Sequence, residues 1–323
     1  METAERYRDR QVAYAGVVGE DLTIPSANPI NHHQAITDPG GCEPIDIDAK
    51  LFVPVDATSP SPSPTVMIVP GSLGVGANHE SHAETLVAAG FAVCVVDPFG
   101  PRSVASTVAN QTQYSFAASA FDVLATLAVL RERPEVDADR IAAQGHSRGG
   151  SAVTIAAHRR FADPIVGTDV GLAAVFAVYP WCGQQFVDPS MGATRFRAII
   201  GDRDEWCSVQ QVQGQVAAIA AGGGEASLRI VPGALHSFDR LEEPYTIDDA
   251  SVAPRAPTVM LAADGALIAV GSDEPAPALT DRDVFISAIA AGFGVQGAAI
   301  GGIGDQPDLF RHEMLAFHEG LRD

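Results

Sequence analysis

One serine in this sequence has the surroundings that a nucleophile requires. Ser147 lies in G-H-S-R-G at residues 145–149, a G-x-S-x-G pattern, with the apolar run 141–143 before it and a predicted helix over 151–158. A buried strand, a sharp turn at a serine and a helix form a nucleophile elbow, which raises the hydroxyl above the edge of a sheet. The pattern alone is common, so an ordinary serine in a strand-to-helix turn is the alternative.

A serine hydroxyl needs a base to take its proton, and that base needs an acid to orient it. Asp204 follows a predicted strand at 196–200, and His236 follows the next one at 226–231. The order Ser, Asp, His is that of the α/β-hydrolases, and loops at adjacent strand ends bring such residues together. We therefore predict a triad of Ser147, Asp204 and His236. Asp202, which is closer to the strand end, is the alternative acid.

An acyl-transfer site also needs two backbone N–H groups to stabilise the oxyanion. Arg148 begins the helix after Ser147 and is predicted to supply one of them. The glycine-rich loop at 70–76 (P-G-S-L-G-V-G) is predicted to supply the other, from Ser72 or alternatively from Leu73. A phosphate-binding loop is the competing interpretation, but the segment lacks the Walker Gly-Lys-Ser/Thr and the Rossmann spacing.

The other histidines and the cysteines have no pattern typical of a metal site. H-E-S-H at 79–82 has the wrong spacing for two ligands on one helical face, and the four cysteines lack metal-binding spacing. His146 is expected to pack under the turn, and Asp239 is too near His236 in sequence to be its acid. Cys182 and Cys207 are expected to be free thiols. We predict neither a metal nor a cofactor.

Predicted strands and helices alternate between residues 66 and 231, which indicates a doubly wound, mostly parallel α/β sheet with helices on both faces. The expected strands are 66–69, 91–96, 141–143, 172–178, 196–200 and 226–231, and the expected helices are 79–90, 115–133, 151–158 and 210–221. Two further strands are predicted at 21–25 and 45–55. The alternating prolines at 60–64 predict a surface connection that is neither helix nor central strand.

The C-terminal part has weaker patterns. Residues 258–270 are typical of a β-hairpin about Asp264-Gly265, and helices are predicted at 284–291 and 309–321. Residues 242–257 are interpreted as a connection. We predict one domain over 1–323, with a core at about 45–240 and an extension at 241–323 packed on it.

Composition excludes some partners. The net charge of −20 argues against nucleic acid and anionic membranes. No apolar run has the length of a membrane span, and residues 1–10 lack the apolar region of a signal peptide, so a cytoplasmic location is expected.

Seven segments in order resemble the dienelactone hydrolase family of the α/β-hydrolases over roughly residues 45–240. They are P-G-S-L-G at 70–74, D-P-F-G-P-R at 97–102, P-E-V-D-A-D-R-I at 134–141, G-H-S-R-G-G at 145–150, Y-P-W-C at 179–182, G-D-R-D-E-W at 201–206 and P-G-A-L-H-S-F at 232–238. The resemblance implies the same triad and a hydrolase of small esters. The name-giving members use a cysteine nucleophile, whereas this chain has Ser147, which resembles the serine esterase branch.

The resemblance also implies a substrate pocket. Dienelactone-cleaving members hold a substrate carboxylate with arginines, and Arg102 and Arg240 lie near the corresponding places; surface arginines in salt bridges are the alternative. Trp181 and Trp206 follow strands at the same edge and are expected either to line an apolar pocket or simply to pack. Leu73 and Phe99 complete the predicted substrate-binding set.

We therefore expect a serine hydrolase that cleaves a small carboxylic ester or lactone through an acyl-serine, with a homodimer possible. A hydrolase of amides, thioesters or polyesters with the same triad is the second reading. A catalytically inactive binding protein of the same fold is the third.

Overall fold

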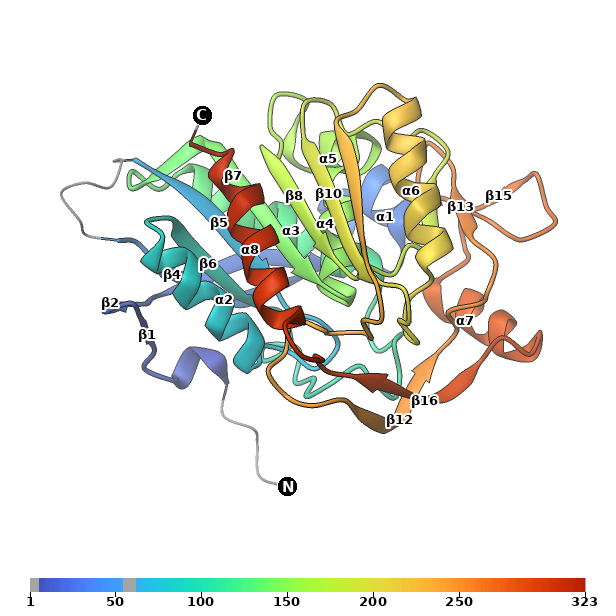
Figure 1. Cartoon of the computed structure of the whole chain (residues 1–323). Helices are drawn as coiled ribbons and strands as arrows, with labels where there is room; N and C mark the ends of the chain where they lie inside the picture. The colour runs from blue at the N-terminus through green and yellow to red at the C-terminus, as the bar shows by residue number, and fades with distance from the viewer. Residues whose placement is uncertain (1–5, 55–61, 323) are drawn as a thin grey trace.

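The centre of the molecule is an eight-stranded sheet (Figure 1) in a computed structural model that describes residues 6–54 and 62–322. Across the sheet the strands are β11 (Ala226–Val231), β10 (Arg195–Gly201), β8 (Ala174–Val178), β7 (Val136–His146), β5 (Ser63–Val69), β6 (Ala92–Asp97), β4 (Glu43–Phe52) and β3 (Glu20–Asn28). The strands from β11 to β6 run parallel, and β4 and β3 add an antiparallel edge. The predicted α/β architecture is confirmed.

Helices cover both faces of this sheet. Of the helices in Figure 1, α2 (Ala77–Ala88) and α8 (Gln306–Glu319) lie on one face, and α3 (Phe116–Arg131), α4 (Arg148–Ala157), α5 (Arg159–Val166) and α6 (Val209–Ala221) lie on the other, where Gln215 of α6 hydrogen-bonds His158. Strands sealed on both faces need continuous apolar side chains, and all residues of β6 and β8 are buried. None of the helices in the described ranges is long and apolar enough to cross a membrane.

The start of β5 differs from the prediction. Residues 55–61 lie outside the described part of the chain, but Ser63 and Pro64 are the first, buried residues of β5 rather than a surface connection. A proline is tolerated there because it opens the strand, and the pairing with β7 shifts register between Ser63 and Thr65.

The N-terminal region contains more structure than the single predicted strand. That strand is confirmed as β3. It is accompanied by α1 (His32–Thr37), the small pair β1 (Ala13–Tyr14) and β2 (Val17–Val18), and the 3₁₀ turns η1 (Tyr7–Asp9) and η2 (Pro39–Gly41).

The C-terminal part forms two small sheets beside the main one. The predicted hairpin is confirmed by β13 (Val259–Leu261) and β14 (Leu267–Ile268), which β9 (Gln184–Phe186) and β15 (Pro275–Ala276) extend. The prediction of a connection over 242–257 is wrong, because β12 (Tyr245–Val252) pairs antiparallel with β16 (Val295–Ile300). Between them in the sequence lies α7 (Asp281–Ala290), which corresponds to the helix predicted at 284–291 and is capped by Thr280.

Candidate active site

The G-x-S-x-G segment forms a sharp turn between β7 and α4. Ser147 has φ of 53°, in the left-handed region that residues with a Cβ rarely adopt, and such strain costs on the order of 1–3 kcal/mol. The two glycines are required by space: a Cβ at Gly145 would lie 2.1 Å from the Gly149 carbonyl oxygen, and one at Gly149 would lie 2.3 Å from the Val69 carbonyl oxygen. The turn therefore presents Ser147 at the carboxyl edge of the sheet.

The three predicted triad residues meet at this edge. His236 Nε2 lies 2.9 Å from Ser147 Oγ, and His236 Nδ1 lies 2.7 Å from Asp204 Oδ2. A carboxylate only accepts hydrogen bonds, so Nδ1 carries the proton toward Asp204 and Nε2 is free to accept the Ser147 hydroxyl proton. The tautomer is the one that a general base requires.

Asp204 is held rigidly. Its other oxygen, Oδ1, accepts hydrogen bonds of 2.8 Å from the backbone N–H groups of Trp206 and Cys207, and its side chain is fully buried. The Trp206 indole stacks on the His236 ring at 5.3 Å between centroids. The alternative acid, Asp202, is exposed and instead accepts the Gly233 N–H, so it fastens the loop that precedes His236.

The two predicted oxyanion donors flank Ser147. Arg148 is the first residue of α4, where an N–H has no carbonyl acceptor within the helix. The Arg148 guanidinium is buried and donates to the carbonyl oxygens of Gln111, Tyr114 and Ser115, and so fixes the loop before α3. Opposite it, the hydroxyl of Ser72 donates to Gln111 Oε1 at 2.9 Å. The loop before α3 is thus hydrogen-bonded to both residues of the predicted oxyanion hole.

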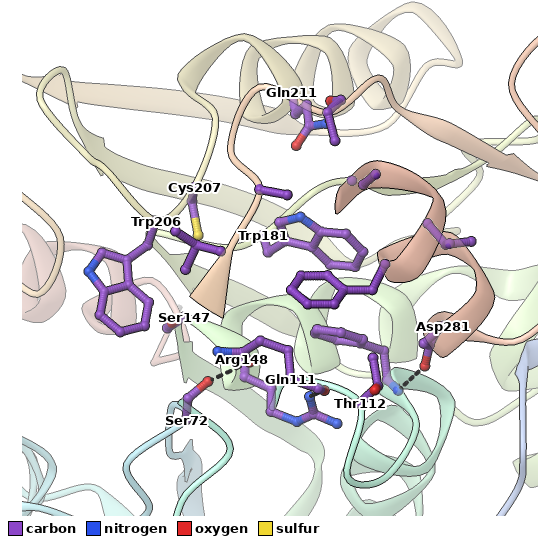
Figure 2. A pocket seen from close by; sticks show the side chains of 18 of the residues that line it. Ser72, Gln111, Thr112, Ser147, Arg148, Trp181, Trp206, Cys207, Gln211 and Asp281 are labelled. Carbon is purple, nitrogen blue, oxygen red and sulfur yellow. Dashed lines mark hydrogen bonds between the residues drawn. The ribbon is translucent and has the colours of Figure 1, made fainter. Parts of the chain in front are cut away.

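Two cavities meet at Ser147, and Ser72 and Trp206 also line both of them. The larger cavity extends from Ser147 past Trp181 to Asp281 (Figure 2). The smaller cavity is lined by apolar residues such as Leu73, Val108, Ile247 and Ile300 as well as by polar ones such as His79, His236 and Arg240.

The predicted substrate-binding residues divide between these cavities. Trp181 lines the larger one, where its ring packs 4.6 Å from that of Phe116, and Leu73 and Arg240 line the smaller one. Phe99 lines neither; it is buried against Tyr114 and beneath Gly74.

The predicted role of Arg102 as a substrate clamp does not fit its surroundings. Its guanidinium forms a buried ion pair with Asp122 at 2.7 Å and also donates to Asn28 and to the Pro98 carbonyl oxygen. Arg102 lines neither cavity at Ser147. Its donors are occupied in joining α3 to the edge of the sheet, because the buried carboxylate of Asp122 needs a cation.

A chain of buried hydrogen bonds runs behind Ser147. From α8, His318 Nε2 donates to Gln144 Oε1, whose amide donates to His146 Nε2, each at 3.0 Å. His146 Nδ1 then donates to the Tyr179 hydroxyl at 3.0 Å, and Tyr179 donates to Asp239 Oδ1 at 2.7 Å. His146 therefore packs under the turn, as expected, and links the serine turn to the loop after His236.

Asp239 ends this chain as a buried anion. Its Oδ2 accepts from Asn78 at 2.9 Å and from His82 at 2.8 Å, both on α2. Burial alone would raise the pKa of Asp239, but the hydrogen bond from His82 holds it well below its usual range. His82, His146 and Asp239 bring ligand atoms within 4.8 Å of one another, a grouping that the sequence did not reveal. In this structure, His82 is hydrogen-bonded to Asp239, and both His146 and Asp239 are hydrogen-bonded to the Tyr179 hydroxyl.

All four cysteines are buried free thiols, as expected for Cys182 and Cys207. Burial raises the pKa of Cys207 well above its usual range, and the neighbouring Asp204 raises it further. Cys207 is thus a neutral wall of the larger cavity.

Residues 47–259 match the sequence profile of the dienelactone hydrolase family. The chain belongs to the dienelactone hydrolase family. This is a family of hydrolases with the α/β-hydrolase fold, so the resemblance and the fold predicted from the sequence are confirmed.

Solved structures similar to this member of the dienelactone hydrolase family are distant in sequence. A dienelactone hydrolase-like promiscuous phosphotriesterase from metagenomic libraries has 17% identity and a TM-score of 0.49, over 68% of this chain and 84% of that chain. A thermophilic esterase from Thermogutta terrifontis has 14% identity and a TM-score of 0.47, over 66% and 86%. Est1E from Butyrivibrio proteoclasticus has 16% identity and a TM-score of 0.46, over 67% and 90%. No curated protein matches.

The family match does not extend over the whole site. It ends at residue 259, whereas Asp281, Val284, Phe285 and Ala288 on α7 line the larger cavity. Sequence reasoning missed these residues. The signal available was the strong cap at Thr280, which marks a helix but not the surface that the helix faces.

Proposed function

We propose that this member of the dienelactone hydrolase family is a serine hydrolase that cleaves a carboxylic ester or lactone through an acyl-serine intermediate. The observation that carries the proposal is the continuous line from Asp204 through His236 to Ser147, with separations of 2.7 and 2.9 Å. Nucleophile, base and orienting acid are in hydrogen-bond reach of one another before any substrate binds.

Acylation begins when Ser147 Oγ attacks the ester carbonyl carbon and its proton passes to His236 Nε2. Asp204 stabilises the imidazolium that forms. The tetrahedral intermediate then collapses, the bond from carbon to the alcohol oxygen breaks, and His236 returns the proton to the departing alkoxide. The products of this half are an alcohol and an acyl group on Ser147.

The negative charge on the intermediate is stabilised by the backbone N–H groups of Ser72 and Arg148. One donor of this kind is typically worth about 3–4 kcal/mol of barrier. Gly71 lets the loop approach closely, since a Cβ there would be 3.1 Å from the His146 carbonyl oxygen.

Deacylation repeats the chemistry with water as the nucleophile. His236 takes a proton from the water as it attacks the acyl carbon, and it then protonates Ser147 Oγ as the acid leaves. Each step uses only groups of this chain and water.

Within this function, Arg240 is the group best suited to bind an anionic part of the substrate. Its side chain is 11% exposed, lines the smaller cavity, and approaches Glu242 only to 4.0 Å among the described residues. A guanidinium with unfilled donors favours a carboxylate.

A fluorophosphonate probe tests the proposal. We expect it to label the wild-type protein and the Ser190→Ala control, which removes an exposed serine, but not Ser147→Ala. Turnover of short p-nitrophenyl esters should follow the same pattern. Absence of both labelling and turnover in the wild type would support the third reading, an inactive binding protein. Labelling with turnover of amides or thioesters but not esters would support the second.

A further inference from the structure

The two cavities at Ser147 are lined by different residues of the proposed catalytic site. His236 lines only the smaller cavity, and Arg148 lines only the larger one. In the proposed mechanism His236 must protonate the leaving oxygen, so the alcohol departs on the side where the imidazole lies. The acyl group, bonded to the carbon that Ser147 attacks, then extends to the other side, into the larger cavity.

The larger cavity has the walls of an apolar binding pocket. Its side chains include Phe116, Trp181, Val252, Pro257, Val284 and Phe285. The Phe116 and Trp181 rings form one packed wall, with centroids 4.6 Å apart and planes inclined at 33°. Burying an apolar group there is favourable by about 25 cal/mol per Å², and aromatic walls add preference for a ring.

The outer wall of this cavity is α7, and its start is fixed to the core. The Asp281 carboxylate accepts the Phe116 N–H at 2.7 Å and the Gln184 amide at 2.8 Å. Asn31 Nδ2 donates to the carbonyl oxygens of Pro277 and Leu279, at 2.8 and 2.9 Å. These bonds set the distance between α7 and the Phe116–Trp181 wall, and so set the width of the cavity.

We propose that the larger cavity is an acyl pocket whose α7 wall selects an aromatic or branched apolar acyl group, while the smaller cavity, which His236 lines, receives the alcohol. This assignment rests on the proposed function, because it uses His236 as the acid for the leaving group. The preferred substrate class is an ester that is bulky and apolar on its acyl side.

The test compares two esters with the same leaving group, p-nitrophenyl acetate and p-nitrophenyl phenylacetate. We expect the wild type to prefer phenylacetate. Ala288→Trp places an indole on the inner face of α7 and should lower the ratio of kcat/KM for phenylacetate to that for acetate by about 10- to 100-fold, the scale on which apolar pockets discriminate. Ala290→Trp, on the exposed face of the same helix, should leave the ratio at its wild-type value.

A second variant tests the wall in the opposite direction. Phe285→Ala removes a ring from α7 and so widens the cavity. It should raise the ratio of kcat/KM for p-nitrophenyl naphthylacetate to that for p-nitrophenyl acetate. Fluorophosphonate labelling of every variant reports separately on the serine hydrolase itself.

Three results would overturn the assignment. The first is that Ala288→Trp changes kcat/KM by the same factor for p-nitrophenyl acetate and p-nitrophenyl phenylacetate. The second is that Ala288→Trp changes the ratio of kcat/KM for benzyl acetate to that for methyl acetate, which share the acyl group, but leaves the ratio for phenylacetate to acetate unchanged. In both cases labelling persists, so the proposed function stands while the acyl pocket fails. The third, absence of labelling and turnover in the wild type, removes the proposed function and the acyl pocket with it.

Discussion

The two cavities beside Ser147 share a nucleophile but differ in their origin. The smaller one is built mostly from segments within the family match, among them Asn78, His79 and Arg240, with Ile300 of β16 added from beyond it. The larger one takes an outer wall from α7, beyond the matched residues. Under the proposed function, bond cleavage would therefore belong to the matched core, whereas selection of the acyl group would be added by the C-terminal extension.

The two cavities also differ in how firmly their walls are held. Behind the smaller cavity, Tyr179, His146 and Asp239 are buried and hydrogen-bonded. In α7, by contrast, Asp281 is the buried residue, and Ile286 and Ile289 are 53% and 48% exposed. Changes to the α7 wall should therefore alter specificity at small cost in stability, whereas changes behind the smaller cavity should cost stability first.

The largest predicted effect is independent of which cavity the substrate fills. Asp204→Asn keeps the shape of the side chain but cannot hold the His236 tautomer in the same way, and we expect kcat to fall by about 10⁴-fold. The fall should be the same for p-nitrophenyl acetate and phenylacetate, measured by steady-state kinetics.

Asp202→Asn is the matched control, because Asp202 lies two residues earlier and binds only the Gly233 N–H among the described residues. We expect its kcat to stay close to the wild-type value, because the Asp202 carboxylate bonds to the Gly233 N–H and not to His236. A larger loss in Asp202→Asn than in Asp204→Asn would reverse the assignment of the acid.

The second prediction concerns the guanidinium of Arg240 in the smaller cavity. Arg240→Gln should lower kcat/KM for para-acetoxybenzoate, whose leaving group carries a carboxylate, by about 10- to 100-fold, because a hydrogen bond to a charged group contributes about 1.5–3 kcal/mol. The neutral para-acetoxybenzamide should change far less. Arg203→Gln removes an exposed arginine on the Asp204 loop and is the control. Equal effects on the two substrates would show that Arg240 does not bind the anion.

The parallel sheet and the three meeting residues could be predicted because their signals are local. Continuous apolar runs mark the central strands, which are buried on both faces, and each of Ser147, Asp204 and His236 lies within a few residues after the end of a predicted parallel strand. Parallel strand ends meet at one edge whatever their separation in sequence. Topology therefore brought the three residues together without knowledge of any contact.

What could not be predicted depends on partners far apart in sequence with weak patterns. β12 is largely exposed and lacks regular alternation, so its pairing with β16 left no local signal. Arg102 follows a strand as a pocket residue would, but its guanidinium forms an ion pair with Asp122 instead of lining the pocket. An aspartate within the apolar helix α3 was the available sign that a buried cation must lie nearby.

The third prediction concerns the hydrogen-bonded wall behind the smaller cavity. Tyr179→Phe removes the hydroxyl between His146 and Asp239, leaving two buried polar atoms without this partner. We expect the free energy of unfolding to fall by about 2 kcal/mol, measured by urea denaturation. Ala288→Trp on α7 should cost less than half as much. If the α7 variant costs more, the two walls are not held as differently as their burial indicates.

The smallest effect lies at the far end of the same wall and appears as pH dependence. Burial lowers the pKa of His318 to about 3, from an ordinary value of 6.5. As pH falls below 6.5, the unfolded chain takes up a proton that the folded protein excludes, so the free energy of unfolding decreases. Between pH 7.5 and 5.5 this one group should cost about 1.4 kcal/mol.

His318→Gln should remove that cost while keeping a donor for Gln144, so its stability should fall by about 1.4 kcal/mol less than that of the wild type over the same pH interval. His312→Gln, exposed on the same helix, should retain the wild-type slope. The measurement is urea denaturation at both pH values. An unchanged slope in His318→Gln would mean that His318 is protonated in the folded protein. The chain of hydrogen bonds from His318 to Asp239 would then begin at a cation, and the wall behind the smaller cavity would carry a second buried charge.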